Sequence, residues 1–138
     1  MASPSASKLD GVFKPQSIAI IGASTRTGTV GSDLLHNLIK DGYTGKIYPV
    51  NPKAADIQGV KCYPTLTDIP GPVDLAVLVV PYKAVPGLVD ESKTKGVKGM
   101  VIISAGFKEM GHEGIEREKA LTEQIRAAGI PLIGPNCL

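Results

Sequence analysis

The sequence predicts an α/β fold, a doubly wound parallel sheet of about five strands with helices on both faces. Short apolar runs alternate along the chain with segments of helical periodicity, and 43% of the residues are hydrophobic while 4% are aromatic. A Gly/Ser/Thr-rich segment, residues 22–31, directly follows the first apolar run. Because parallel strands joined through a helix cross over with a right hand, this alternation places helices on both faces of one sheet.

Two strands, a helix and a short helical turn are expected in the first half of the chain. After the opening apolar run and the Gly/Ser/Thr-rich segment, apolar residues recur at helical spacing until Asp41-Gly42 gives a stop signal. A second run, rich in β-forming residues, ends at the turn signal Asn51-Pro52. The expected elements are strands over 17–21 and 46–50, a helix from residue 30, and one helical turn within 63–70.

The second half supplies three more strands and two helices. Residues 75–80 form an almost continuous apolar run, which is typical of a parallel strand covered on both faces and therefore indicates the centre of the sheet. The final helix has apolar residues on one face and ends at Gly129, a residue suited to a helix C-terminus. The expected elements are strands over 73–80, 100–104 and 131–133, the last near an edge, and helices over 84–95 and 113–128.

One domain, over residues 8–138, is the expected organisation. Residues 1–7 are rich in Ala, Ser and Pro and lack the features of a secretory signal, so we expect a flexible tail and a cytoplasmic protein. Apolar runs are too short for a membrane span, and a net charge of +2 with scattered basic residues argues against nucleic acid as a partner. Cys62 and Cys137 have no ligand neighbours at metal-binding spacing, so free thiols and no metal site are expected.

The Gly/Ser/Thr-rich segment is typical of a phosphate-binding turn. Glycines let the backbone approach an anion, the following helix offers N–H groups and a positive dipole end, and the hydroxyls of Ser24, Thr25 and Thr27 add donors. The spacing is neither the G-x-G-x-x-G of dinucleotide enzymes nor a P-loop. The sequence therefore predicts a Rossmann-like nucleotide site at the carboxyl ends of the strands, where ligands of such sheets bind.

The end of the second strand narrows the choice of nucleotide. Enzymes that use NAD place an acidic residue there to accept hydrogen bonds from the ribose hydroxyls. Here the strand ends Val50-Asn51-Pro52-Lys53, with a cation and no carboxylate. This favours a nucleotide with a phosphorylated ribose, which leaves NADP and coenzyme A (CoA).

Five segments, one at each strand end, carry a family resemblance. They read SIAIIGAS at 17–24, YPVNPK at 48–53, VDLAV at 73–77 with Val80-Pro81, ISAGF at 103–107 and GPNCL at 134–138. Together they resemble the CoA-binding domain of NDP-forming acyl-CoA synthetases, relatives of the succinyl-CoA synthetase α subunit. The likeness runs from about Lys8 to the last residue.

The resemblance implies coenzyme A as the cofactor and assigns no catalytic residue to this chain. The Ser24–Thr27 loop and Gly28 would hold the CoA phosphates, Lys53 would meet the ribose phosphate or the pyrophosphate, and the loops at 80–81 and 103–105 would line the adenine and pantetheine path. The expected CoA-binding residues are Gly22, Ser24, Thr25, Arg26, Thr27, Gly28, Val50, Asn51, Pro52, Lys53, Val80, Pro81, Ile103, Ser104 and Ala105.

The resemblance also implies a reaction and partners. The family converts acyl-CoA, a nucleoside diphosphate and phosphate into the acid, the triphosphate and CoA, using a phosphohistidine domain and an ATP-grasp domain that this sequence does not contain. We therefore expect the chain by itself to bind CoA without turnover. Two alternatives stay open: a non-catalytic CoA-binding module, free-standing or attached to a protein acetyltransferase, and an NADP-linked dehydrogenase domain, which the departure from G-x-G-x-x-G disfavours.

Overall fold

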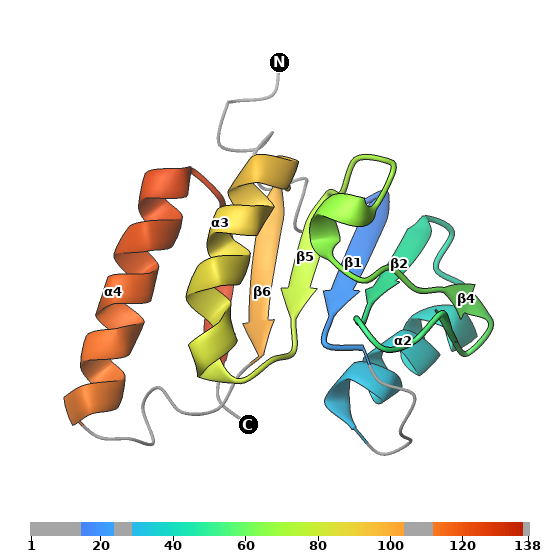
Figure 1. The fold of residues 1–138 in the computed structure, drawn as a ribbon, viewed down its shortest axis with the longest axis horizontal. Coiled ribbons are helices and arrows are strands. Elements are labelled where there is room, and N and C mark those ends of the chain that lie inside the picture. The colour runs from blue at the N-terminus through green and yellow to red at the C-terminus, as the bar shows by residue number, and fades with distance from the viewer. Residues whose placement is uncertain (1–14, 24–28, 104–111, 137–138) are drawn as a thin grey trace.

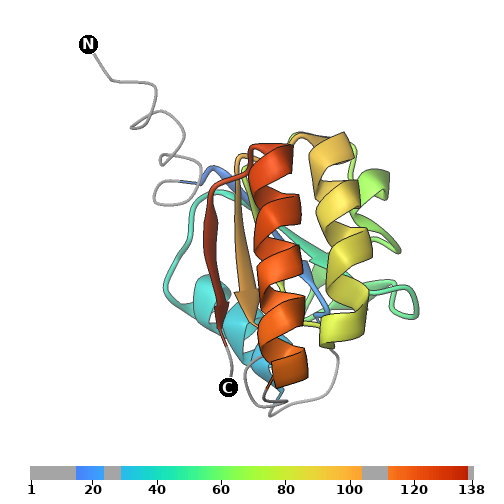
Figure 2. The same ribbon diagram turned by 90° about the vertical axis from the view of Figure 1, so that its left-hand side faces the viewer.

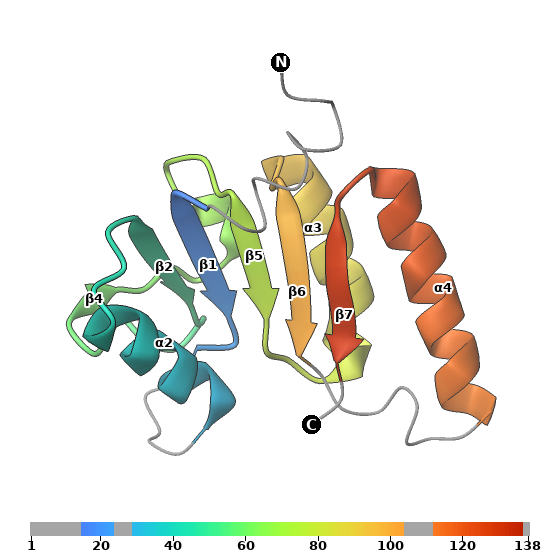
Figure 3. The ribbon, with the colours of Figure 1, turned by 180° about the vertical axis from the view of Figure 1, so that it is seen from behind.

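The predicted doubly wound sheet is confirmed. A computed structural model describes residues 15–23, 29–103 and 112–136, and its five-stranded sheet has the order β2-β1-β5-β6-β7, with every pair parallel. The strands all point to the same edge (Figure 1, with β7 seen in Figure 3), and the most apolar run lies in the middle, as β5. The bounds are β1 (Ser17–Ile21), β2 (Lys46–Val50), β5 (Leu75–Leu78), β6 (Gly99–Ile103) and β7 (Leu132–Asn136).

Helices cover both faces of the sheet. Helices α3 (Val85–Lys95) and α4 (His112–Ala128) lie side by side on one face (Figure 2), and α2 (Val30–Lys40) lies on the other (Figure 3). The three helices stand where the sequence predicted them, and the expected helical turn is the 3-10 helix η1 (Leu66–Asp68). A second 3-10 turn, η2 (Tyr82–Ala84), precedes α3. No helix in the described part of the chain is long and apolar enough to cross a membrane.

Side chains of the buried strands point alternately to the two faces of the sheet, which divides the hydrophobic core into two clusters. Strand β1 is buried at all five positions, and its successive side chains point to opposite faces. Ala19 and Ile21 belong to the cluster that packs under α3 and α4, whereas Ile18 and Ile20 pack with Leu35 of α2. Side chains therefore pack against both faces of the sheet. The loops at its carboxyl edge begin from strands that are buried on both sides.

A two-stranded hairpin was not predicted from the sequence. Strands β3 (Asp56–Ile57) and β4 (Val60–Lys61) pair antiparallel between β2 and η1. Immediately after the hairpin, Tyr63 forms a parallel bridge with Val50, donating to the Pro49 carbonyl and accepting from the Asn51 N–H, each at 2.9 Å. This segment therefore extends pairing along the end of β2, which is an edge strand of the main sheet.

Candidate functional site at the carboxyl edge

The ends of β2, β1 and β5 lie in one row. Ile21 pairs with Val50 on one side and with Leu78 on the other, so the loops after these three strands begin beside each other. From β1 the chain passes to β2, and from β5 it passes to β6 in the opposite direction. The reversal between β1 and β5 is the switch point at which such sheets form a ligand crevice.

Glycine is required after β1, at Gly22, and in the first turn of α2, at Gly31. Gly22 has φ +96°, and a Cβ atom there would lie 1.9 Å from the Val79 carbonyl oxygen. A Cβ on Gly31, in the first turn of α2, would lie 2.6 Å from the Gly22 carbonyl oxygen. The backbone of β1, the end of β5 and the start of α2 therefore pack against one another without intervening side chains. Glycines that allow a tight turn and close packing of helix on strand are typical of the first strand-to-helix turn in nucleotide-binding sheets.

Helix α2 presents a capped N-terminus at this edge. The Thr29 hydroxyl accepts a hydrogen bond from the Ser32 N–H at 3.2 Å, and the Thr29 carbonyl accepts from the Asp33 N–H at 2.9 Å. The first N–H groups of a helix and its dipole together attract an anion. Asp33 is exposed in the first turn, so the local field there combines a helix dipole with one carboxylate.

Asn51 joins the first loop to the second. Its side-chain Nδ2 donates to the Ala23 carbonyl at 2.9 Å, and its Oδ1 accepts from the Lys53 N–H at 2.8 Å. Both ends of the amide are therefore engaged within the protein. Lys53 and Pro52 are exposed at the rim, which leaves the Lys53 ammonium at the surface beside the carboxyl edge.

The structure brings several of the predicted residues together and leaves others undescribed. Gly22 donates its N–H to the Val50 carbonyl at 3.2 Å, and a Cβ on Gly22 would lie 3.2 Å from a Val80 methyl group. The Val50 side chain is 5% exposed and belongs to the core, whereas Pro81 is exposed and Ile103 is half-buried at the end of β6. Five loop residues, Ser24 to Gly28, and two residues after β6, Ser104 and Ala105, lie outside the described part of the chain.

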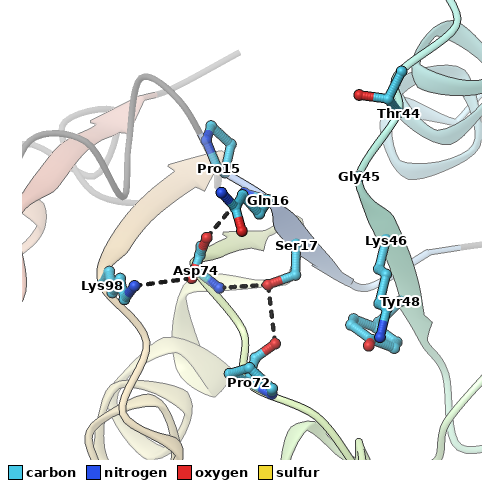
Figure 4. Close-up of a pocket in the computed structure, with 10 residues that line it drawn as sticks. All are labelled: Pro15, Gln16, Ser17, Thr44, Gly45, Lys46, Tyr48, Pro72, Asp74 and Lys98. Atoms are coloured by element: carbon cyan, nitrogen blue, oxygen red, sulfur yellow. Dashed lines mark hydrogen bonds and ion pairs between the residues drawn. The ribbon is translucent and has the colours of Figure 1, made fainter.

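A pocket formed by described residues lies at the opposite, amino edge of the sheet (Figure 4). There Asp74 accepts from the Gln16 N–H at 2.9 Å and pairs with Lys98 at 3.5 Å, while the Ser17 hydroxyl donates to the Pro72 carbonyl and accepts from the Asp74 N–H. These groups satisfy one another and fix the starts of β1 and β5. We therefore assign the pocket a structural role and keep the candidate site at the carboxyl edge.

Sequence reasoning missed a residue of the hairpin that contacts the start of α2. Gln58 donates from Nε2 to the Ser32 carbonyl at 3.0 Å and to the Ser32 hydroxyl at 3.3 Å. The signal in the sequence is Gln58-Gly59, an X-Gly pair at which both residues adopt positive φ, 52° and 81°. Within the described residues, no group of three His, Cys, Asp or Glu side chains could hold a metal ion.

The fold and the carboxyl-edge geometry define a Rossmann-like nucleotide-binding domain, and comparison with known proteins specifies its family. A family model described as "CoA binding domain" matches residues 16–138. The chain belongs to this family, which confirms coenzyme A as the predicted cofactor. The start of α2 fits this ligand, because it lies at the carboxyl edge and the positive end of a helix dipole attracts a phosphate.

Similar proteins include ligases from archaea. The chain is 50% identical over 124 residues to an ADP-forming acetate-CoA ligase of Methanocaldococcus jannaschii, covering 90% of this chain and 17% of the relative. It is 48% identical over 130 residues to the α subunit of ADP-forming acetate-CoA ligase II of Pyrococcus furiosus, covering 94% and 28%. Its fold matches a dinucleotide-forming acetyl-coenzyme A synthetase 1 of Candidatus Korarchaeum cryptofilum with a TM-score of 0.86 and 43% identity, covering 93% and 28%. The chain thus spans less than a third of each of these relatives.

Proposed function

We propose that this chain is the CoA-binding domain of an ADP-forming acid-CoA ligase. The observation that carries the proposal is identity of 43–50% to such ligases across nine-tenths or more of the chain. The reaction of the whole ligase is acyl-CoA, nucleoside diphosphate and phosphate to acid, triphosphate and CoA, or the reverse. A non-catalytic CoA-binding module is the second candidate, because binding by this domain needs no catalytic group of its own.

The proposed ligand arrangement follows from the carboxyl edge. The loop from Ser24 to Gly28 and the N-terminus of α2 hold CoA phosphates, for which hydroxyl donors and the positive end of a helix dipole are suited. Lys53, exposed at the rim, meets the ribose 3′-phosphate or the pyrophosphate. Val80-Pro81 and the segment 103–105 line the adenine and pantetheine path, for which the half-buried Val80 and Ile103 provide apolar contact.

The partners of the domain are the other parts of the ligase. The relatives are more than three times as long as the matched region, which leaves room for a phosphohistidine domain and an ATP-grasp domain. We propose that these supply the phosphoryl transfer while this domain presents the CoA thiol.

Calorimetric titration of the chain with CoA, dephospho-CoA, NADP and NAD tests the ligand. We expect saturable CoA binding that weakens when the 3′-phosphate is absent. Ser24→Ala should weaken CoA binding as well, because it removes a hydroxyl donor from the phosphate loop. Binding of NADP without binding of CoA would contradict the proposal and favour a dehydrogenase.

Lys53→Ala locates the phosphate end of the ligand. Loss of a charge-assisted contact is expected to weaken CoA about tenfold. If Lys53 meets the 3′-phosphate, the substitution leaves dephospho-CoA affinity unchanged; if it meets the pyrophosphate, both ligands weaken equally. Lys46→Ala is the matched control, because Lys46 is an exposed lysine at the start of β2, at the opposite edge of the sheet from Lys53, which follows the end of that strand. Equal weakening by both substitutions would point to a general charge effect and remove the specific role of Lys53.

A further inference from the structure

The turn of the β3–β4 hairpin holds a glutamine in an unfavourable backbone conformation. Among the described residues, Gln58 is the non-glycine residue with a positive φ, 52°, and it precedes Gly59 at 81°. Two-residue hairpin turns with both residues at positive φ favour Asn-Gly, and the left-handed conformation is unfavourable for most other residues. Something else in the structure must therefore favour glutamine at this position.

The side chain of Gln58 supplies the compensation. Its Nε2 group donates to both the carbonyl and the hydroxyl oxygen of Ser32, in the first turn of α2. Ser32 is 4% exposed, and its N–H donates to the Thr29 cap. The amide of Gln58 thus contacts the residue through which the helix N-terminus is capped.

The hairpin that carries Gln58 is anchored by a buried side chain and by backbone hydrogen bonds. Ile57, directly before Gln58, is 2% exposed and packs in the same cluster as Leu35 of α2. Cys62, directly after β4, donates its N–H to the Ala55 carbonyl at 2.9 Å, and its thiol donates to the Asn51 carbonyl at 3.6 Å. The hairpin therefore touches both α2 and the loop after β2, the two segments to which the proposed function assigns CoA phosphate contacts.

We propose that Gln58 is a positioning residue for CoA binding. By bonding to Ser32 it holds the first turn of α2 against the hairpin, so that the positive end of the helix is oriented toward the phosphates before CoA arrives. Preorganisation of this kind increases affinity because less ordering is left to occur on binding. The inference rests on the proposed function, since it concerns the same site.

Gln58→Gly separates this role from a contribution to folding. Glycine adopts φ 52° without strain, so the relief of strain offsets the lost hydrogen bonds and the urea midpoint stays close to that of the unchanged chain. We expect the Kd for CoA to rise about three- to tenfold. Gln58→Asn provides a second variant that keeps an uncharged amide and tolerates the left-handed conformation, but is one methylene too short to reach Ser32. It should show the same loss.

A matched control and a ligand-free measurement complete the test. Gln124 also bridges two elements, donating from Nε2 to the Pro86 carbonyl at 2.9 Å and to Asp90 at 3.1 Å. Gln124→Ala removes a similar pair of bonds on the other face of the sheet and should leave CoA affinity unchanged. Amide hydrogen exchange without CoA should become faster at Ser32 and Asp33 in Gln58→Gly and remain unaltered in Gln124→Ala.

The outcomes separate the two proposals. Unchanged CoA affinity in both Gln58 variants, or unchanged exchange at Ser32 and Asp33, overturns the positioning role while the CoA site stands. A loss of affinity that only accompanies a lower urea midpoint, and that Gln124→Ala reproduces, also overturns it. If the unchanged chain fails to bind CoA, the proposed function itself fails, and the exchange data still report whether Gln58 fixes the helix start.

Discussion

At the scale of single residues, the turn after β1 depends on the absence of a side chain at position 22. Gly22 has a positive φ, and any Cβ there meets the carbonyl oxygen of Val79. That carbonyl has little freedom to move, because the Val79 N–H donates to the Ile21 carbonyl at 2.7 Å beside the central strand. The contact between β1 and the end of β5 is therefore fixed by backbone atoms alone.

Gly22→Ala is expected to lower the free energy of unfolding by about 3 kcal/mol or more, because backbone strain adds to a clash with an immobile carbonyl. Urea denaturation measures the change. Gly42→Ala is the control, since Gly42 has φ +75° but no atom lies within 4 Å of the position that a Cβ would take, so only the conformational cost of about 1 kcal/mol applies. Equal losses in the two variants would show that the clash with Val79 contributes nothing.

Cys62 gives a pH-dependent prediction at the same scale. The thiol is free and buried, and burial raises its pKa above the ordinary value of 9.0. The unfolded chain therefore loses this proton at a lower pH than the folded chain does. The contribution of Cys62 to stability is fully present below pH 9.0 and falls as the pH rises from there through the folded pKa.

Urea denaturation of the unchanged chain and of Cys62→Ala at neutral pH and at about pH 10 measures this contribution. We expect the difference in unfolding free energy between the two proteins to shrink at the higher pH, because the thiolate is favoured only in the unfolded chain. A difference that is constant across this range would show that the thiol titrates equally in both states.

At the scale of elements, the cap of α2 connects stability with the proposed phosphate site. The Thr29 hydroxyl accepts from the Ser32 N–H, so Thr29→Ala is expected to cost about 1 kcal/mol of unfolding free energy. Thr29→Ser keeps the accepting oxygen and should stay within a few tenths of a kcal/mol of the unchanged chain. Chemical denaturation of the three proteins distinguishes these values, and a comparable loss in the serine variant would assign the effect to the methyl group of Thr29.

Helices and strands with a long hydrophobic run or a clear helical periodicity were predictable from the sequence. The β3–β4 hairpin was not. The apolar run that became β5 and the periodicity of α3, with Val85 and Val89 fully buried, carry their own signal. The two-residue strands β3 and β4 are too short to show any periodicity. They are held by tertiary contacts such as the burial of Ile57, which no local pattern records.

At the candidate site, too, some features could be predicted from the sequence and others could not. The close turn at Gly22 and the end of β2 just before Lys53 were predictable, because both follow from residue types at a known place in the sequence. Asn51 stays a predicted ligand contact, and the sequence did not predict that both polar ends of its amide bond to the backbone at Ala23 and Lys53. Which partner a polar side chain takes depends on distances between loops, and those follow only from the folded sheet.

At the scale of the whole molecule, the amino edge and the carboxyl edge of the sheet have different structural roles. At the amino edge, Asp74 and Ser17 bond to neighbouring backbone and fix the starts of the central strands (Figure 4). At the carboxyl edge, Asn51 and Gln58 connect separate segments around the start of α2. Hydrogen bonds therefore fix the starts of the central strands at one edge and join the loops around α2 at the other.

A single chain of this kind should bind CoA and carry out no reaction. A ligand that binds only the folded chain stabilises it by RT ln(1 + [L]/Kd), so CoA at about 100 times its Kd is expected to raise the unfolding free energy by about 2.7 kcal/mol. The same preparation, incubated with acetate, CoA and ATP, should form no acetyl-CoA, because the phosphoryl-transfer parts of the proposed ligase belong to other domains.

Urea denaturation with and without CoA and a chromatographic assay for acetyl-CoA measure both halves of this prediction on one sample, and NAD at the same concentration is the control ligand. Stabilisation without product fits a binding domain within a larger ligase. Formation of acetyl-CoA by the pure chain would place catalytic groups inside these 138 residues and overturn the division of labour proposed here. Equal stabilisation by NAD would instead show that the carboxyl edge does not select for CoA.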